Sequence, residues 1–152
     1  MIQYMNLIGK NARKAVLKRI DTKVKNKILN RYSSLLNREQ NSIIKANLKD
    51  IEFAQKKGLK SNLIDRLTIN HKKLSNIKDS INRIVKLKDP IDNTLETWSR
   101  PSGLKIKKVS IPIGVIGVIY ESRPNVTSDV ASLCFKSGNA VILKGGSEAI
   151  NT

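Results

Sequence analysis

The fold is decided by residues 112–147, PIGVIGVIYESRPNVTSDVASLCFKSGNAVILKGGS. Residues 113–120 are apolar apart from two glycines and show no alternation, which predicts a parallel strand buried on both faces. After a polar turn, residues 126–137 have helical spacing and precede a glycine. Residues 140–143 predict a second buried strand. Strand, helix and strand joined by short loops predict a βαβ unit in an α/β fold.

Polar loops follow the carboxyl ends of the two expected strands, at residues 120–125 and 144–147. Ligands of parallel sheets bind at this edge, so the loops predict a ligand site. Asn125 is expected either to cap the helix, a role open equally to Thr127, or to donate its amide N–H to an oxyanion. Arg123 is a candidate for binding an anion.

The second loop, KGGS at residues 144–147, offers a lysine and two flexible glycines. Such a loop provides a cation and backbone N–H groups to phosphate or ribose oxygens, although two glycines after a strand also form ordinary turns. Gly114 and Gly117 do not have the G-x-G-x-x-G spacing of a dinucleotide site and fall inside the expected strand. We interpret them as allowing close backbone packing.

The remaining candidate nucleophile and metal ligands favour structural roles. Cys134 lies on the apolar face of the expected helix, with no histidine near it in sequence, and is interpreted as a small packing residue. A single cysteine excludes an intrachain disulfide and fits a reducing cytoplasm. The only histidine, His71, is expected at the surface. No catalytic triad, carboxylate pair or metal-binding cluster is visible in the sequence.

Residues 1–89 have apolar positions at helical spacing. The expected helices are 5–20, 21–36 with Asp21 as N-cap, 43–54 with a stop at Gly58, 61–67, and 74–87 ending before Pro90. The second helix is predicted to bury Val24, Ile28, Tyr32, Leu35 and Leu36.

A β-hairpin is predicted between the helices and the βαβ unit. Residues 104–107 alternate apolar and charged side chains, the period of a half-exposed strand, and residues 95–98 supply a facing strand. The turn is expected at residues 100–103, which contain a proline and a glycine. Trp98 fits either a core position or an interface anchor.

The chain has 152 residues and a net charge of +17. No apolar run approaches the length of a membrane span, and the N-terminal residues do not predict a secretory signal. A basic nucleic-acid-binding module is one alternative function. However, the bases are spread along the chain and are not interleaved with aromatic side chains, so a solvated basic surface is the favoured interpretation.

The stretch from residue 111 to 148 closely resembles γ-glutamyl phosphate reductase, a branch of the aldehyde dehydrogenase superfamily. The resemblance is carried by P-x-G-V-I-G-V-I-Y-E-x-R-P-N-V-T and K-x-G-N-A-V-I-L-[KR]-G-G. Earlier residues also fit, among them Asn47, Asp50, Ala54 and residues 64–67. The resemblance implies N-terminal helices, a β-ribbon and the first βαβ of a Rossmann-like cofactor domain.

In this family, NADPH reduces L-glutamyl 5-phosphate to L-glutamate 5-semialdehyde with release of phosphate, in proline biosynthesis. A cysteine thiolate forms a thioester that accepts the hydride. The resemblance implies a homo-oligomer in the cytoplasm, with glutamate 5-kinase as a further partner, no membrane association and no resident metal. Another acyl-reducing relative, such as an acyl-thioester reductase, is the alternative within the superfamily; the E-x-R-P-N motif favours the phosphate substrate.

The resemblance also assigns roles to individual residues. Asn125 resembles the family's oxyanion asparagine, although a difference in loop length allows Arg123 to occupy that place; Arg123 is also the expected clamp for the substrate phosphate. The cofactor-binding residues are Lys144, Gly145, Gly146 and Ser147. Many NAD-dependent relatives carry a glutamate where this chain has Ser147, so NADPH is predicted over NADH.

The implied organisation is a helical part of the cofactor-binding domain at residues 1–94, an oligomerisation ribbon at 95–110 and the start of the Rossmann-like unit at 111–152. The family's nucleophilic cysteine lies downstream of the Lys-Gly-Gly loop, and Cys134 matches a non-catalytic position. The sequence is therefore expected to be an N-terminal fragment without the catalytic domain, and to have no reductase activity by itself.

Overall fold

The computed structural model describes residues 2–152 and has the α/β architecture expected from the sequence. Five helices come first: α1 (Ile2–Val16), α2 (Thr22–Arg38), α3 (Gln40–Lys56), α4 (Ser61–Leu67) and α5 (His71–Lys86). A ribbon and a βαβ unit follow: β1 (Thr94–Ser99), β2 (Lys105–Val109), β3 (Val115–Ile119), α6 (Pro124–Lys136), β4 (Ala140–Lys144) and the 3-10 helix η1 (Ser147–Ala149).

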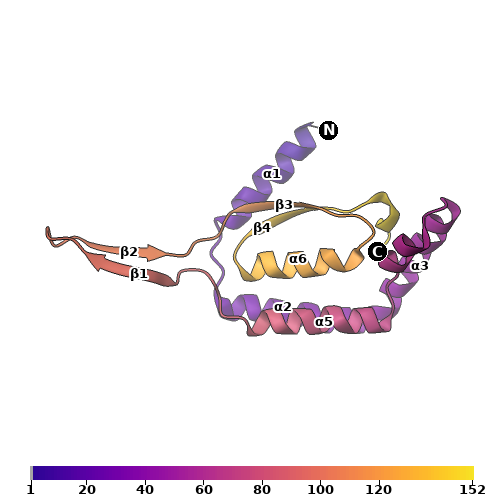
Figure 1. The fold of residues 1–152 in the computed structure, drawn as a ribbon, viewed down its shortest axis with the longest axis horizontal. Coiled ribbons are helices and arrows are strands. Elements are labelled where there is room, and N and C mark those ends of the chain that lie inside the picture. The colour runs from indigo at the N-terminus through magenta and orange to yellow at the C-terminus, as the bar shows by residue number, and fades with distance from the viewer. Residues whose placement is uncertain (1) are drawn as a thin grey trace.

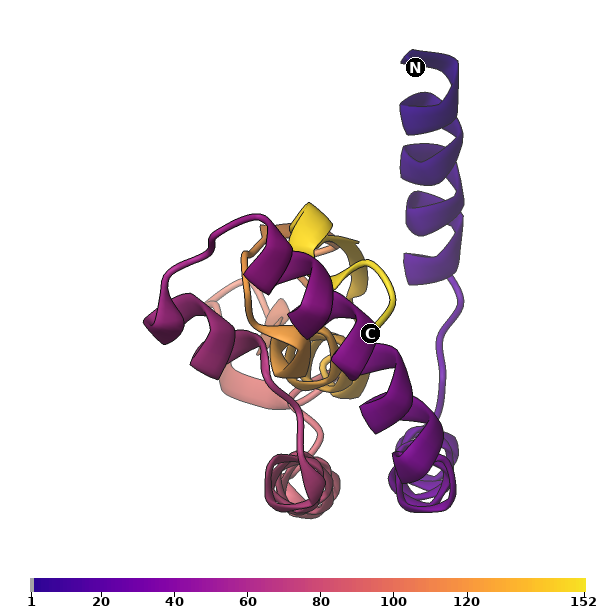
Figure 2. The same cartoon turned by 90° about the vertical axis from the view of Figure 1, so that its right-hand side faces the viewer.

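The elements stack in layers around the β3–β4 sheet. Helix α1 lies against one face of this sheet and α6 against the other, and α2 and α5 pack on the far side of α6 (Figures 1 and 2). Helices α3 and α4 close the end of the molecule where the chain terminates (Figure 2). The helical layers therefore support the βαβ unit. The edge of the sheet at which the strands end lies next to α3.

The hydrophobic core lies between α2, α5 and α6 rather than around the sheet. Its buried residues are Leu29, Ile69, Leu74, Ile77, Ile81 and Ile84. The predicted buried face of α2 is partly wrong, because Val24 and Ile28 are exposed and the buried positions are Lys25, Leu29 and Ser33. The buried face of α2 is rotated because two of its polar side chains bond to the α5 region. Lys25 bonds to Asp89, just after α5, and Ser33 bonds to Asn82 within α5.

Several helix ends differ from the sequence prediction, among them the end of α1 and the start of α6. Helix α1 ends at Val16, and Ile20, predicted to lie inside it, falls in the linker to α2. Helix α6 begins at Pro124 with Arg123 as N-cap, not at Asn125 or Thr127. Proline suits the first helical position because its fixed φ is helical and its missing N–H would be unpaired there anyway.

The βαβ prediction is confirmed by the pairing of its strands. β3 and β4 are parallel, with Val115 opposite Ala140 and Ile119 opposite Lys144. The predicted burial on both faces is wrong within residues 2–152, because alternate residues of β3 are exposed. The sequence of β3 is therefore as apolar as that of a fully buried strand, although the described residues cover the strand only in part.

The interpretation of Gly114 and Gly117 as close-packing glycines is also wrong for the described residues, since a β-carbon at either would meet no atom within 4 Å. Gly114 precedes β3 and has φ +126°, a conformation that residues with a β-carbon rarely adopt. Its N–H donates to Asn139 Oδ1 at 2.8 Å, which ties the start of β3 to the start of β4.

The predicted hairpin is a two-stranded antiparallel ribbon that projects from the body (Figure 1). Trp98 pairs with Ile106, and the N–H of Arg100 bonds the carbonyl of Leu104 across the turn. All of β1 is exposed, and Trp98 is 40% exposed. A core position for Trp98 is therefore wrong within the described residues.

A polar cluster fixes the base of the ribbon to the helical body. Asp89 Oδ2 accepts bonds from Lys25 Nζ and Thr22 Oγ1, both at 2.8 Å, and Asp89 Oδ1 accepts the N–H of Ile91. Across the base, Ser110 Oγ donates to the carbonyl of Pro90. The ribbon thus leaves the body in a defined direction, although nothing in residues 2–152 packs on its strands.

A buried lysine joins three helices beneath the sheet. Lys136, near the end of α6, is 3% exposed, and its Nζ donates to Asn26 Oδ1 at 2.6 Å and to the carbonyl of Val85 at 3.0 Å. Val85 is in the last turn of α5, where carbonyls lack helical partners and a cation is favourable. Lys136 therefore holds α6 in register with α2 and α5.

No helix in residues 2–152 has the length and apolar character of a membrane span.

Candidate functional site

The structure brings the two predicted loops together at the carboxyl edge of the sheet. The N–H of Tyr120 donates to the carbonyl of Lys144 at 3.1 Å, which extends the parallel pairing into both loops. The ring of Tyr120 lies 3.5 Å from the position of a β-carbon on Gly145, and its hydroxyl bonds that of Thr127. Residues 120–125 and 144–147 thus form one surface.

Glu148 links the two loops and was not identified from the sequence. Its carboxylate accepts hydrogen bonds from both the N–H and the hydroxyl of Ser122. Ser122 is buried and has φ +46°, which is unusual for a residue with a side chain. The two bonds from Glu148 hold the loop in this conformation, one residue before the N-cap of α6.

Gly146 leaves the space that this link requires. A β-carbon at residue 146 would overlap the carboxylate of Glu148. Burial alone would raise the pKa of Glu148, but hydrogen bonds from its own N–H and from Ser122 outweigh burial and hold the pKa below its usual value. Glu148 is therefore ionised near neutrality and directed inward at Ser122, rather than outward at a ligand.

The segment after the second loop is anchored to α3 by Asp50. This carboxylate accepts the N–H and amide of Asn151 and the N–H and hydroxyl of Thr152, at 2.6–3.1 Å. Asn47, one turn earlier, donates to Thr152 and accepts the N–H of Ile69. Both α3 residues are fully buried, so residues 148–152 rest on a rigid support.

The predicted site residues lie around these loops but face different directions. Arg123, Lys144 and Ser147 are exposed, and no hydrogen bond or ion pair in residues 2–152 involves their side chains. Asn125 points toward α5 instead: its Nδ2 donates to Asp129 Oδ2 at 3.3 Å, and it lines a cavity with α5 residues. The side chains of Arg123, Lys144 and Ser147 are therefore exposed on the two adjoining loops, whereas that of Asn125 is bonded within α6.

The structure supports the packing interpretation of Cys134. The thiol is buried, and burial raises its pKa, which disfavours the thiolate form needed for nucleophilic attack. His71 is exposed, as expected, and its Nδ1 bonds Gln40 Oε1 at 2.9 Å. Neither side chain therefore supplies catalytic chemistry to the loops.

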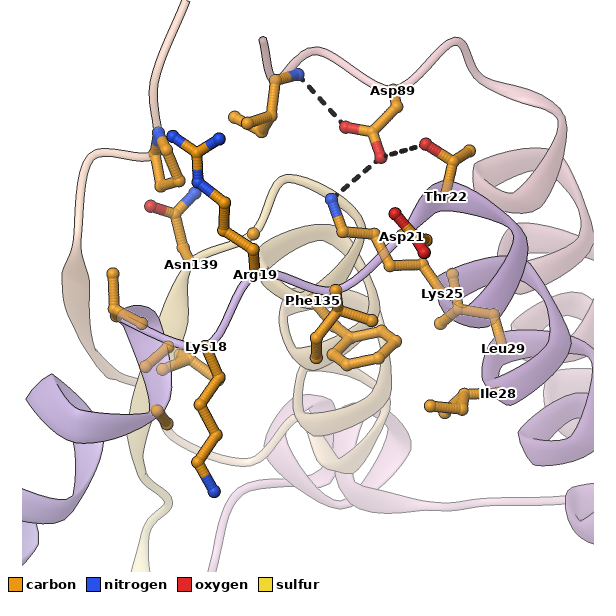
Figure 3. Close-up of a pocket in the computed structure, with 18 of the residues that line it drawn as sticks. Lys18, Arg19, Asp21, Thr22, Lys25, Ile28, Leu29, Asp89, Phe135 and Asn139 are labelled. Atoms are coloured by element: carbon orange, nitrogen blue, oxygen red, sulfur yellow. Dashed lines mark hydrogen bonds and ion pairs between the residues drawn. The ribbon is translucent and has the colours of Figure 1, made fainter.

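A cavity of about 830 Å³ lies at the opposite end of the sheet, between the α1–α2 linker, α2 and the ribbon base (Figure 3). Figure 3 shows Lys25 and Thr22 directed at Asp89, with Phe135 and Leu29 forming the apolar side. Residues that precede β3 and β4 line it, so it faces the amino ends of the strands. The Rossmann rule places nucleotides at the carboxyl ends, which separates this cavity from the candidate site.

The lowered pKa values of three carboxylates determine how the stability of the fold is expected to depend on pH. Burial alone would raise the pKa values of Asp50 and Asp89, but bonds from Thr152 and Asn151, and from Lys25 and Thr22, hold both below the usual 3.8. Glu148 is likewise below 4.5. A lowered pKa adds stability that is complete above the usual value and is lost as pH falls through the lowered one.

We therefore expect the free energy of unfolding, measured with urea, to be level from pH 7 to about 5 and to fall below about pH 4. Because the net charge of +17 also causes repulsion at low pH, the control is Asp50→Asn, which should weaken the acid dependence by the contribution of Asp50 and leave the repulsion and the other two carboxylates in place. Stability that rises between pH 5 and 3 would contradict the assignment.

The chain is similar in sequence to proteins named γ-glutamyl phosphate reductase. No family model matches the chain. The γ-glutamyl phosphate reductase of Thermodesulfovibrio yellowstonii is 50% identical over 131 residues, covering 86% of this chain and 31% of that protein. The Clostridium tetani protein of the same name is 46% identical over 152 residues, covering 99% and 36%. The chain spans about a third of the length of the curated relatives it matches.

Solved structures give the same result for the fold. The crystal structure of γ-glutamyl phosphate reductase from Thermotoga maritima matches with a TM-score of 0.90 at 40% identity, over 93% of this chain and 35% of that one. The Saccharomyces cerevisiae enzyme matches with a TM-score of 0.90 at 36% identity, over 95% and 38%. The resemblance predicted from residues 111–148 is therefore confirmed over nearly the whole chain.

Proposed function

We propose that this chain, similar in sequence and fold to about a third of each γ-glutamyl phosphate reductase, supplies the start of the cofactor domain of such an enzyme. The reaction is the reduction of L-glutamyl 5-phosphate by NADPH to L-glutamate 5-semialdehyde and phosphate, in proline biosynthesis. The observation that carries the proposal is the fold match combined with an exposed cationic surface at the sheet edge where Rossmann-like folds bind nucleotides.

The loop residues fit an anionic dinucleotide. Lys144 and Ser147 are exposed at the end of β4, and the carboxylate of Glu148, the residue after Ser147, is bonded to Ser122. Residues 144–147 therefore contribute a cation and a hydroxyl and contain no carboxylate of their own, and Gly145 and Gly146 place backbone beside them. When bound, NADPH supplies the hydride; Lys144 would attract its phosphates and Ser147 would leave room for the 2′-phosphate.

The first loop is proposed to bind the substrate phosphate. Arg123 is exposed at the N-cap of α6, and the first turn of α6 contains no acidic residue, so the guanidinium and the helix N-terminus reinforce one another toward an anion. Asn125 uses one amide N–H for Asp129, which leaves the other for a developing oxyanion. The nucleophilic thiolate would come from outside residues 1–152, because Cys134 is buried.

The other parts of the chain are assigned by the same proposal. Residues 1–94 form the helical support of the cofactor domain, residues 95–110 the oligomerisation ribbon, and residues 111–152 the opening βαβ unit. The exposed strands of the ribbon support association into an oligomer. The proposal also places the enzyme in the cytoplasm, with glutamate 5-kinase as a candidate partner.

NADPH preference tests the cofactor assignment. In a reductase carrying this chain, we expect a lower KM for NADPH than for NADH. Ser147→Glu should raise the KM for NADPH about tenfold, because a carboxylate facing a phosphate costs about 1 to 4 kcal/mol at contact distance. Ser102→Glu, the same charge change on the exposed ribbon turn, is the control and should leave both KM values unchanged. Equal or better use of NADH by the unmutated protein would contradict the assignment.

A further inference from the structure

A second, smaller cavity of about 320 Å³ lies between α5 and the first turns of α6. Helix α5 contributes Lys73, Asn76, Ser80 and Arg83, and α6 contributes Asn125 and Asp129. Nearly every lining side chain is polar, although the two helices are otherwise packed through apolar core residues. The cavity adjoins the N-terminus of α6, and thus the loop of Arg123.

Opposite charges line this cavity without neutralising each other. Within residues 2–152, the ion pairs include neither Asp129 nor Arg83. The Lys73 ammonium is held by backbone carbonyls, those of Asp65 and Thr68, rather than by a carboxylate. A carboxylate and a guanidinium are therefore left beside the same small space.

Asp129 is also incompletely hydrogen-bonded. Its Oδ2 accepts the amide N–H of Asn125 at 3.3 Å, whereas its Oδ1 is buried and has no partner among the described residues. A buried acceptor without a donor is unfavourable, and a charged donor is the strongest that a ligand can offer a carboxylate. Asp129 is thus an ionisable acceptor in the lining of this cavity whose hydrogen-bonding capacity the described residues do not fill.

A zwitterion fits this pair of charges better than an ion of one sign. Asp129 opposes a simple anion such as phosphate, and Arg83 with Lys73 opposes a simple cation. An α-amino acid carries an ammonium and a carboxylate on one carbon, and arginine binds carboxylates through two parallel N–H bonds. The cavity is also at the lower end of the range that holds small ligands.

We propose that Asp129 and Arg83 bind the α-ammonium and α-carboxylate of an amino-acid substrate. This inference rests on the proposed function, because it places the amino-acid end of the substrate beside α5 and its γ end toward Asn125 and Arg123. Asn125 then has two tasks: one N–H orients Asp129, and the other faces the substrate.

The test is an NMR titration of the 152-residue chain with three probes. L-glutamate has both α groups, glutarate lacks the ammonium, and 4-aminobutyrate lacks the α-carboxylate. We expect saturable shifts around the cavity with L-glutamate, and about tenfold weaker binding of each of the other two, since each loses one charge-assisted contact.

Two variants assign the contacts. Asp129→Asn should abolish the preference for glutamate over glutarate, and Arg83→Gln should abolish the preference for glutamate over 4-aminobutyrate. Asp79→Asn, an exposed position on α5 outside the cavity, and Arg31→Gln on α2 are matched controls that should keep both preferences. If Asp129→Asn unfolds, the exposed Arg83 still tests the second preference.

The inference is overturned if glutamate gives no saturable shifts, if all three probes bind equally, or if the control variants behave like the cavity variants. These outcomes are separate from failure of the proposed function. Lack of glutamyl phosphate reduction by an enzyme carrying this chain would remove the function and leave glutamate binding standing, whereas normal reduction with no glutamate preference at Asp129 and Arg83 would remove only this inference.

Discussion

Replacing Asp89 by alanine is expected to lower the free energy of unfolding by about 3 to 5 kcal/mol, because it leaves the Lys25 ammonium buried without its counter-ion. The Lys25 side chain is only 5% exposed and that of Asp89 13%, and their charged atoms are 2.8 Å apart. Thr22 and the N–H of Ile91 lose their acceptor in the same variant. The cost falls on the junction between α2 and the ribbon.

Urea denaturation with a matched control measures this effect. Asp92 forms the exposed ion pair of the same region with Arg19, at 3.4 Å, and has φ +58°, which asparagine tolerates, so Asp92→Asn should change stability by less than about 1 kcal/mol. The double variant Lys25→Met with Asp89→Leu should recover most of the loss, since it removes both charges. An Asp89→Ala protein as stable as the Asp92→Asn protein would show that the buried pair has no structural role.

Replacing Glu148 by alanine is expected to release the loop at residues 120–125. The N–H and hydroxyl of buried Ser122 lose their shared acceptor, which costs about 1 to 3 kcal/mol for an unsatisfied buried donor. The backbone of Ser122 has φ +46°, which is unfavourable for a residue with a side chain, so the loop is expected to leave this conformation once these bonds are lost. We expect hydrogen exchange of the Ser122 amide to become at least about tenfold faster.

Two variants separate the bonds from the charge. Glu148→Gln keeps a carbonyl acceptor of the same length and should retain most of the protection at Ser122. Glu121→Ala removes an exposed carboxylate of the same loop and should leave the exchange rate unchanged. Unaltered protection of Ser122 in Glu148→Ala would mean that Glu148 does not hold the loop.

The elements that the sequence predicted well have local causes. The βαβ unit and the ribbon follow from runs of apolar or alternating residues and from turn residues between them, and these depend on no distant contact. The start of α6 at Pro124 was missed, although a proline at the first helical position is itself a start signal. Asn125 was predicted as the N-cap because asparagine is common at N-cap positions.

The features that were missed depend on residues far apart in the chain. The rotation of α2 follows from the bond between Lys25 and Asp89, 64 residues away, and a lysine gives no sign of burial in an amphipathic pattern. Glu148 bonds to Ser122, which is 26 residues away in the chain. The only related signal in the sequence is Gly146, where a β-carbon would overlap the Glu148 carboxylate. The exposure of β3 reflects how few elements in residues 2–152 cover it, which its apolar sequence does not express.

The charge of +17 also changes meaning with the structure. The ion pairs in residues 2–152 engage only Arg19, Lys25, Arg38 and Lys108 among the bases, so most of the positive charge is solvated. The bases with a proposed role are grouped at two places, Lys144 with Arg123 at the strand ends and Arg83 beside α6. Both places suit small charged ligands rather than a long polyanion.

Exchange of the matching segment in a known reductase tests the central claim most directly. The Clostridium tetani relative, 46% identical over 152 residues, is made with this chain in place of its own segment. Oxidation of glutamate 5-semialdehyde with NADP⁺ and phosphate, the reverse reaction, is followed by the formation of NADPH. We predict a rate within about tenfold of the parent enzyme, or about 1.4 kcal/mol in the barrier, and none from the 152-residue chain alone. A folded chimera that forms no NADPH while the parent does would contradict the account.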